Sequence, residues 1–151
     1  KGQIYLHDIR THALQDGRKR LRRAGIQNAQ VIEAEDAKLK KLKKQMDWVL
    51  VDAPCTGTGT MRRNPEMKWN FNEDVLVRLV GQQRTIFEKA LSYLKPEGHI
   101  VYATCSILKE ENESQVEHFV KTYDLKVNKT FQSLPLEGGM DGFFGVVLSK
   151  N

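Results

Sequence analysis

The stretch Trp48-Val-Leu-Val-Asp-Ala-Pro-Cys-Thr-Gly-Thr-Gly59 joins four apolar residues to an acid, a proline, a thiol and two glycines. The apolar run is too short for a helix and is followed by turn-forming residues, which predicts a strand buried on both faces. A second predicted strand, His99-Ile-Val-Tyr-Ala-Thr104, runs directly into Cys105. The chain therefore places each of its 2 cysteines just beyond a predicted strand.

The rest of the chain alternates strand and helix patterns around these two strands. Helical spacing is clearest at 73–95, where an apolar stripe ends at Lys95-Pro-Glu-Gly98. The other expected elements are helices at 12–24 and 110–122 and strands at 3–7, 29–33, 125–127 and 143–148. This alternation favours an α/β fold with an open, mostly parallel sheet covered on both faces.

Ligands bind such sheets at the carboxyl ends of the strands. Residues that can do chemistry lie just beyond several of the predicted strands, namely Asp8, Asp36, Asp52 and Cys105. We therefore expect them to converge on one edge of the sheet, and Cys55 and Cys105 to be neighbours in the fold.

Length and composition indicate one globular domain. A chain of 151 residues with 40% hydrophobic content buries one substantial core. No apolar run approaches the roughly 20 residues of a membrane span, and no secretion signal is present at the N-terminus, so we expect a soluble, cytoplasmic protein with free thiols. The four histidines are scattered and neither cysteine has a close cysteine partner, which argues against a metal site.

The positive charge is concentrated in the first third of the chain. Residues 1–44 hold 12 basic and 5 acidic side chains, a net charge of +7, whereas residues 45–151 hold 12 and 14, a net charge of −2. Clusters such as Arg18-Lys-Arg-Leu-Arg-Arg23 fit contacts with a phosphate backbone. For any single cluster, a solvated helix face is the more common explanation.

Two acids fit contacts to a nucleoside. A carboxylate at the end of an early strand accepts hydrogen bonds from both ribose hydroxyls, which suits Asp8. Asp36 suits a contact to an adenine amino group, although Glu33 and Glu35 are alternatives. Each acid, taken alone, is equally well explained as a helix cap or an exposed turn residue.

A single thiol at a strand end is usually a small buried hydrophobe. Two thiols at equivalent positions weaken that explanation. A free cysteine has a pKa of about 8.5, so a catalytic thiolate needs a neighbour that lowers this value. For Cys105, the positive end of the helix predicted near Glu110 is one candidate.

Four strings in this order resemble the Sun-type (NOL/NOP/Sun) family of RNA cytosine-5 methyltransferases. The second, Arg62-Arg-Asn-Pro-Glu-Met-Lys-Trp69, is most similar to the bacterial branch that modifies small-subunit ribosomal RNA. The others are Val51-Asp-Ala-Pro-Cys-Thr-Gly-Thr-Gly59, Tyr102-Ala-Thr-Cys-Ser-Ile107 with Glu110-Glu-Asn-Glu113, and Asp141-Gly-Phe-Phe144. The resemblance covers nearly all of residues 1–151 and implies a Rossmann-like class I methyltransferase sheet.

The resemblance also implies an activity and its residues. Cys105 matches the nucleophile that attacks C6 of cytosine, which makes C5 electron-rich enough to take a methyl group from S-adenosyl-L-methionine. Cys55 matches the cysteine that assists release of the methylated RNA by promoting loss of the C5 proton. Asp52 matches an acid that contacts the target base, and with Asp8 and Asp36 it completes the expected cofactor-binding set.

A base must leave its stack to reach such a pocket, so the expected substrate is single-stranded or flipped RNA. Arg62, Arg63 and Lys68 are expected to hold RNA phosphates. Trp69 has two interpretations, a stacking platform for a base or an anchor in the core.

The family pattern is incomplete at the N-terminal side. The glycine-rich loop that follows the first strand in the family is expected before Lys1, so residues 1–151 are expected to be the C-terminal portion of a methyltransferase domain and inactive alone. The missing strand would lie between the strands ending at His7 and Val51. We therefore expect this gap to be closed within the chain or covered by a dimer contact between strand edges. Ala13 also departs from the family, which often has arginine there.

Two other functions remain open on sequence grounds. A methyltransferase acting on another target, such as an amine, transfers the methyl group directly and has no use for paired thiols. A non-catalytic RNA-binding module would explain the basic first third, and its RNA binding would depend on salt but not on a cofactor.

Overall fold

The structure is a computed structural model and describes residues 2–33, 36–136 and 139–151. The chain, expected to form one domain, divides into two compact units, Lys1–Lys43 and Lys44–Asn151. Glu35, one of the alternatives to Asp36, lies outside the described residues.

The first unit is a two-stranded parallel sheet with helices. The strands pair in register from Ile4 opposite Ala29 to His7 opposite Ile32, so their carboxyl ends lie at the same edge. Leu14 of the first helix and Ile32 are buried in this unit. Its elements are β1 (Ile4–His7), α1 (Thr11–Arg23), β2 (Ala29–Ile32) and α2 (Lys38–Lys41).

The second unit is built on a four-stranded sheet with strand order β3-β4-β6-β5. The pair β3–β4 is parallel, but β4–β6 and β5–β6 are antiparallel, so this sheet is mixed rather than mostly parallel. The connection from β5 to β6 contains no helix in its described part, and without a crossover two successive strands pair antiparallel. The strands are β3 (Met46–Asp52), β4 (Leu94–Thr104), β5 (Leu125–Ser133) and β6 (Phe143–Lys150).

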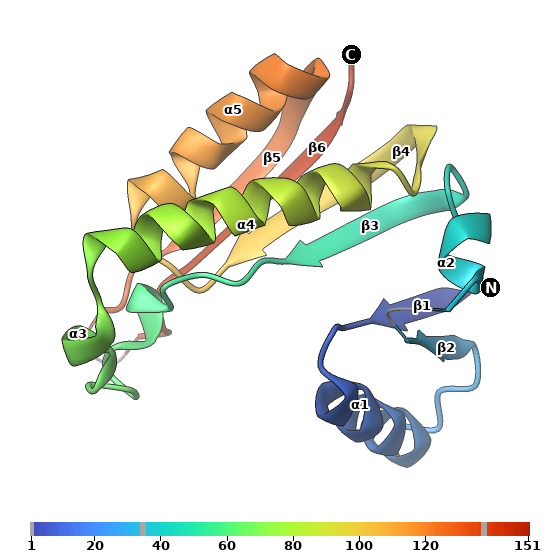
Figure 1. Cartoon of the computed structure of the whole chain (residues 1–151), viewed down its shortest axis with the longest axis horizontal. Coiled ribbons are helices and arrows are strands. Elements are labelled where there is room, and N and C mark those ends of the chain that lie inside the picture. The colour runs from blue at the N-terminus through green and yellow to red at the C-terminus, as the bar shows by residue number, and fades with distance from the viewer. Residues whose placement is uncertain (1, 34–35, 137–138) are drawn as a thin grey trace. The chain divides into compact units, whose positions relative to one another are not determined.

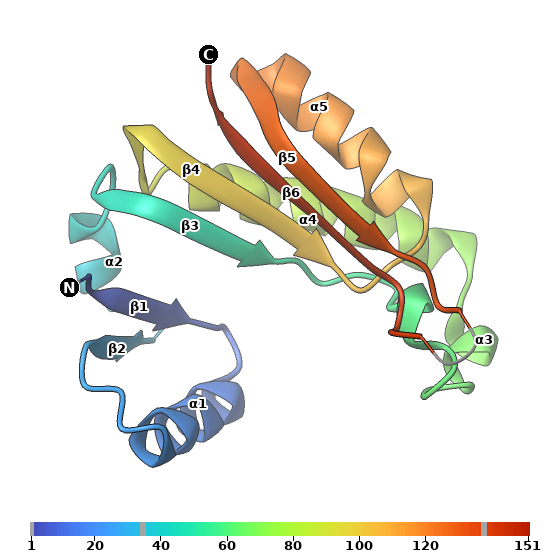
Figure 2. The same cartoon turned by 180° about the vertical axis from the view of Figure 1, so that it is seen from behind.

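Both long helices of this unit, α4 (Glu73–Leu91) and α5 (Glu113–Tyr123), cover the same face of the sheet, as the two opposite views in Figures 1 and 2 show. The rings of Phe87 and Phe119 stack with centroids 3.7 Å apart, and Tyr102 meets both edge-on. These buried aromatic rings join the two helices to β4. The remaining elements are the short helices η1 (Thr58–Thr60), α3 (Met67–Asn70) and η2 (Lys109–Glu111).

The prediction that the strand ending at Val51 is buried on both faces is wrong within this unit. Val51 is 4% exposed, but Trp48 and Leu50 are 60% and 69% exposed. Successive side chains of a strand point to opposite faces, and the helices of this unit pack on only one of them. The opposite face therefore carries exposed apolar side chains.

Several boundaries differ from the sequence prediction. The helix expected at 73–95 ends at Leu91, and the turn residues 95–98 lie within β4. They form an irregularity, because Met46 pairs with Leu94 whereas Trp48 pairs with His99. The helix expected at 110–122 is instead η2 followed by α5, and the strand expected at 125–127 continues to residue 133.

β1 pairs with β2 in the first unit, and β3 pairs with β4 in the second. The expected closure of the gap and the alternative edge-strand dimer both stay predictions. Among the described residues, no helix combines the length and the apolar character that crossing a membrane requires.

Candidate functional site

The topology of the second unit brings the two cysteines together. β3 and β4 are parallel neighbours with Asp52 opposite Ala103, so the loops that follow them leave the same edge of the sheet side by side. Both thiols are free and partly buried, and the sulfur atoms of Cys55 and Cys105 are 3.4 Å apart. The predicted proximity of the two cysteines is confirmed.

The contact between the sulfurs makes the two thiols unequal. The hydrogen bond from the Cys55 thiol is the main cause that lowers the pKa of Cys105 to about 7, against the opposing effects of burial and of the Asp52 and Glu111 carboxylates. The same contact and burial raise the pKa of Cys55 far above its ordinary value. Above about pH 7 the pair therefore carries one negative charge, and Cys105 holds it.

This inequality predicts selective alkylation. In the native protein, we expect iodoacetamide to modify Cys105 first, with a rate that rises through about pH 7, while Cys55 stays unmodified until Cys105 has reacted, because only the thiolate reacts. Cys55→Ala removes the donor, and the half-maximal pH for Cys105 should then rise toward the ordinary value of about 8.5. Peptide mass spectrometry at early times and several pH values measures both sites. Equal initial rates at the two cysteines would contradict the assignment.

Asp52 ends β3 and is exposed at the same edge of the sheet. Its carboxylate is close enough to Cys105 to oppose ionisation of that thiol. The site thus combines an ionised thiol, a protonated thiol and an exposed carboxylate. The helix proposed from sequence to lower the pKa of Cys105 begins only at Glu113, and the effect of a helix dipole falls off within the first turn.

Close backbone contacts join the loops around the cysteines. Gly59 N–H donates to the carbonyl of Cys105 (2.9 Å), and Gly142 N–H donates to the carbonyl of Gly59 (2.8 Å). A Cβ atom at Gly59 would collide with both the Gly142 and Cys105 carbonyls. The second glycine of the opening stretch is therefore required for packing between loops, whereas Gly57 adopts the left-handed conformation with φ 70°.

Two buried side chains that the sequence reasoning missed also hold the Cys55 loop. Glu111 accepts hydrogen bonds from the backbone N–H (2.9 Å) and hydroxyl (2.6 Å) of Thr56. Gln83 Nε2 donates to Glu111 Oε1 and to the carbonyl of Pro54, at 3.0 Å each. A signal for Gln83 was present, because it lies four residues from both Leu79 and Phe87 on the apolar stripe of α4, where an amide needs a buried partner.

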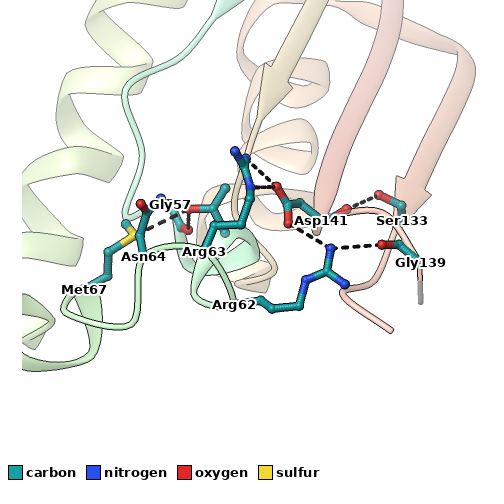
Figure 3. Close-up of polar contacts among 9 residues, drawn as sticks. Gly57, Arg62, Arg63, Asn64, Met67, Ser133, Gly139 and Asp141 are labelled. Carbon is teal, nitrogen blue, oxygen red and sulfur yellow. Dashed lines mark hydrogen bonds and ion pairs between the residues drawn. The ribbon is translucent and has the colours of Figure 1, made fainter. Parts of the chain in front are cut away.

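The expected phosphate-binding arginines have protein partners in this structure. Figure 3 shows Arg62 and Arg63 pointing toward Asp141, which comes from the string Asp141-Gly-Phe-Phe144. Arg63 Nε donates to Asp141 Oδ2 (2.6 Å), and Arg62 Nη2 donates to the Gly139 carbonyl (3.0 Å) and lies 3.7 Å from Asp141 Oδ1. Both arginines keep exposed surface, with 49% of the Arg62 side chain and 65% of the Arg63 side chain exposed.

The neighbouring helix α3 presents a basic and an aromatic side chain to solvent. Lys68 is exposed, and Trp69 is 84% exposed, which excludes the core-anchor interpretation within this unit. A pocket of about 180 Å³ lies between this region and Cys55. Its lining is mainly apolar and comprises Cys55, Thr56, Met67, Phe71, Val75 and Leu79.

The first unit holds the other two expected site acids. Asp8 accepts hydrogen bonds from the backbone and guanidinium group of Arg10 at 2.8–3.0 Å, and these bonds lower its pKa to about 2. Asp36 Oδ1 accepts a hydrogen bond from Lys38 N–H (2.8 Å), a local contact just before the N-cap Ala37 of α2. Both acids lie beyond the carboxyl-end edge of the β1–β2 sheet. Their convergence with Asp52 and Cys105, in the other unit, stays a prediction.

Comparison with known proteins identifies relatives across most of the chain. Ribosomal RNA small subunit methyltransferase B of Vibrio cholerae is 43% identical over 114 residues, which are 71% of this chain and 26% of that protein. The structure of NSun6 from Pyrococcus horikoshii with SFG superposes on 99% of this chain and 42% of that one, with 26% identity and a TM-score of 0.85.

A more distant neighbour shows the fold class. A SAM-dependent methyltransferase from Aquifex aeolicus, 15% identical, matches 98% of this chain and 69% of that one with a TM-score of 0.57. The fold is thus the Rossmann-like α/β fold of class I methyltransferases, as predicted. The chain spans about a quarter of the length of the curated relatives it matches. The family model described as 16S rRNA methyltransferase RsmB/F matches residues 1–148, and the chain belongs to this family.

Proposed function

We propose that the protein containing this chain methylates C5 of a cytosine in small-subunit ribosomal RNA, using S-adenosylmethionine and a covalent cysteine adduct. The observation that carries the proposal is the pair of sulfur atoms 3.4 Å apart, with Cys105 as the thiolate, beside the exposed Asp52. Direct transfer to an amine requires no such pair. The family and its named ribosomal RNA methyltransferases supply the substrate class.

The first step is attack of the Cys105 sulfur on C6 of the cytosine. The sulfur supplies the electron pair of the new S–C6 bond, and the C5–C6 double-bond electrons shift toward C5 and the ring, where N3 takes a proton from solvent that the Asp52 carboxylate relays. C5 becomes nucleophilic and takes the methyl group. Covalent catalysis of this kind replaces one difficult substitution by two easier steps.

Cys55 becomes a base only after this attack. The Cys105 thiolate holds the proton on Cys55 through its hydrogen bond and its charge. Once the Cys105 sulfur is bonded to carbon, that charge is gone and the pKa of Cys55 falls, so its proton can pass to the Asp52 carboxylate or solvent. The Cys55 thiolate then removes the C5 proton, the C5–C6 double bond re-forms as Cys105 leaves as a thiolate, and N3 returns its proton to solvent.

The residues of the first unit fit S-adenosylmethionine. Asp8 stays ionised because Arg10 holds its pKa near 2, and an ionised carboxylate beyond a strand end accepts hydrogen bonds from ribose hydroxyls. Asp36 keeps one carboxylate oxygen for the adenine amino group beside the oxygen that binds Lys38 N–H. When bound, S-adenosylmethionine supplies the methyl group from its sulfonium. The relative whose structure is titled with SFG, an analogue of this cofactor, supports the assignment.

Exposed side chains near α3 are proposed to hold the RNA, with Trp69 stacking on a base and Lys68, Arg62 and Arg63 contacting phosphates. We expect Trp69→Ala to weaken RNA binding by about 1–3 kcal/mol, the usual contribution of one stacked base. Filter binding with 16S-type rRNA fragments measures the change. Trp48→Ala, which removes an exposed tryptophan on the sheet face, is the matched control. Equal effects of the two variants would argue against a stacking role.

Methyl transfer to defined RNA tests the proposal as a whole. The full-length protein, incubated with tritiated S-adenosylmethionine and unmodified small-subunit ribosomal RNA, is expected to incorporate label. Nuclease digestion and mass spectrometry should then identify 5-methylcytidine. Label recovered on an exocyclic amine, or RNA binding without incorporation, would favour one of the two alternative functions.

A further inference from the structure

Two consecutive buried residues, Glu111 and Asn112, hold the residues that flank the two cysteines, one residue for each cysteine. Glu111 ends η2 and Asn112 precedes α5, and both side chains are 0% exposed. Neither residue is part of the attack or of the proton transfers described above. Their hydrogen bonds lead to the neighbours of Cys55 and of Cys105.

Glu111 reaches both sides of Cys55. On one side its carboxylate accepts from the N–H and hydroxyl of Thr56 at 2.9 and 2.6 Å. On the other side Gln83 Nε2 bridges Glu111 Oε1 and the Pro54 carbonyl at 3.0 Å each. The two peptide groups that flank Cys55 are thereby held from one carboxylate.

Asn112 reaches both sides of Cys105. Its Oδ1 accepts from the hydroxyl of Thr104 (2.6 Å), and its Nδ2 donates to the carbonyl of Ser106 (2.9 Å). The flanking residues of the second cysteine are therefore fixed from the residue next to Glu111. Because Glu111 and Asn112 are adjacent in the chain, the planar peptide bond between them fixes the spacing of their backbones.

The Glu111 carboxylate is buried without a cation. In the part of the chain that the structure describes, neutral donors surround it and no ion pair reaches it. A further series of hydrogen bonds orients these donors, from Arg84 Nε to Gln115 Oε1 (2.9 Å) and from Gln115 Nε2 to Gln83 Oε1 (2.8 Å). A buried unpaired carboxylate is unfavourable for stability, so its retention needs another reason.

We propose that Glu111 and Asn112 are positioning residues that hold the two sulfur atoms in contact. Loosening either set of hydrogen bonds lets the Cys55 thiol move away from Cys105 and breaks the S–H···S contact of 3.4 Å. The nucleophile then loses the donor that keeps it ionised near neutral pH. The inference rests on the proposed function only for its effect on methyl transfer, because the sulfur contact is measurable without RNA or cofactor.

Alkylation of Cys105 by iodoacetamide against pH tests the inference in the full-length protein. Glu111→Gln keeps the size of the side chain but loses the charge and one acceptor. If Glu111 acts by position, the half-maximal pH rises by about one unit toward the ordinary thiol value. If Glu111 acts only through its charge, which disfavours ionisation of Cys105, the half-maximal pH falls. The direction of the shift in half-maximal pH therefore distinguishes a positioning role of Glu111 from a purely electrostatic one.

Two gentler variants keep the test valid if Glu111→Gln fails to fold. Thr56→Val and Thr104→Val each delete one hydroxyl donor, to Glu111 and Asn112 respectively, and keep the shape of the side chain. Each variant should raise the half-maximal pH for alkylation of Cys105 by roughly half a pH unit. Glu110→Gln, an exposed neighbour of the same chemistry, is the matched control and should not change it. Unchanged profiles in both threonine variants would overturn the inference.

Methyl transfer gives an independent readout. The positioning variants should lower kcat by about tenfold or more with little change in KM for RNA, since misplaced reacting groups slow the chemical step. If the alkylation profiles shift but the parent protein transfers no methyl group, the proposed function fails and the positioning role stands. If methyl transfer is found but the profiles do not move, the positioning role alone fails.

Discussion

Cys105→Ala in the full-length protein should lower methyl transfer by at least about 10³-fold, because the reaction loses the group that forms the bond to C6. Removing an activated nucleophile leaves only the rate enhancement that binding and orientation provide. The measurement is single-turnover incorporation of tritium from labelled S-adenosylmethionine into small-subunit ribosomal RNA.

Lys109→Ala is the matched control for this variant, since Lys109 begins η2, just after the loop that holds Cys105, and is exposed. It should retain activity close to that of the parent protein. Thermal melting of both variants shows whether the fold is intact. Activity of Cys105→Ala within tenfold of the control would remove Cys105 from the role of nucleophile.

Cys55→Ala should trap the covalent protein–RNA adduct. Without the base that removes the C5 proton, the S–C6 bond has no direct route to break, and turnover should fall by about 10²-fold or more, the usual contribution of general base catalysis. The methylated RNA should then migrate with the protein on a denaturing gel.

The double variant Cys55→Ala with Cys105→Ala distinguishes this adduct from tight binding. It should give no band that survives denaturation, because no nucleophile remains. An adduct of equal intensity in the double variant, or free product released from Cys55→Ala at the parental rate, would contradict the role of Cys55 in release.

The sequence was informative where a local pattern coincides with a fold rule. The apolar runs before Asp52 and Cys105 are short and end in turn residues or polar residues, and they are strands of a parallel pair. Because parallel neighbours end at the same edge, the meeting of Cys55 and Cys105 followed from topology alone. The roles assigned to them came from the family resemblance and remain proposals.

The sequence was less informative where burial depends on partners far along the chain. Trp48 and Leu50 look like core residues, but the described helices of their unit lie on the other face. Glu111 looks like a surface acid beside Glu110 and is fully buried. Its burial requires Thr56 and Gln83, which lie 55 and 28 residues away, and no local pattern encodes such a contact.

The arginines show a third limit of local reasoning. Two adjacent arginines suggested a phosphate site, and both lie against Asp141 instead, 78 residues beyond Arg63. A carboxylate and a phosphate present similar oxygen atoms to a guanidinium group, so the same side chains fit either partner. Sequence alone cannot choose between them, whereas the structure places Asp141 just before β6 and beside both side chains.

Mapping of a trapped adduct tests the central assignment most directly. RNA carrying 5-fluorocytidine at the target position blocks removal of the C5 substituent, so the parent protein with both thiols intact should stop at the covalent stage. After digestion with protease and nuclease, mass spectrometry should find the fluorinated, methylated nucleotide on the peptide that contains Cys105, and Cys55 unmodified. A nucleotide attached to Cys55, or complete absence of an adduct from protein that methylates ordinary RNA, would contradict the account.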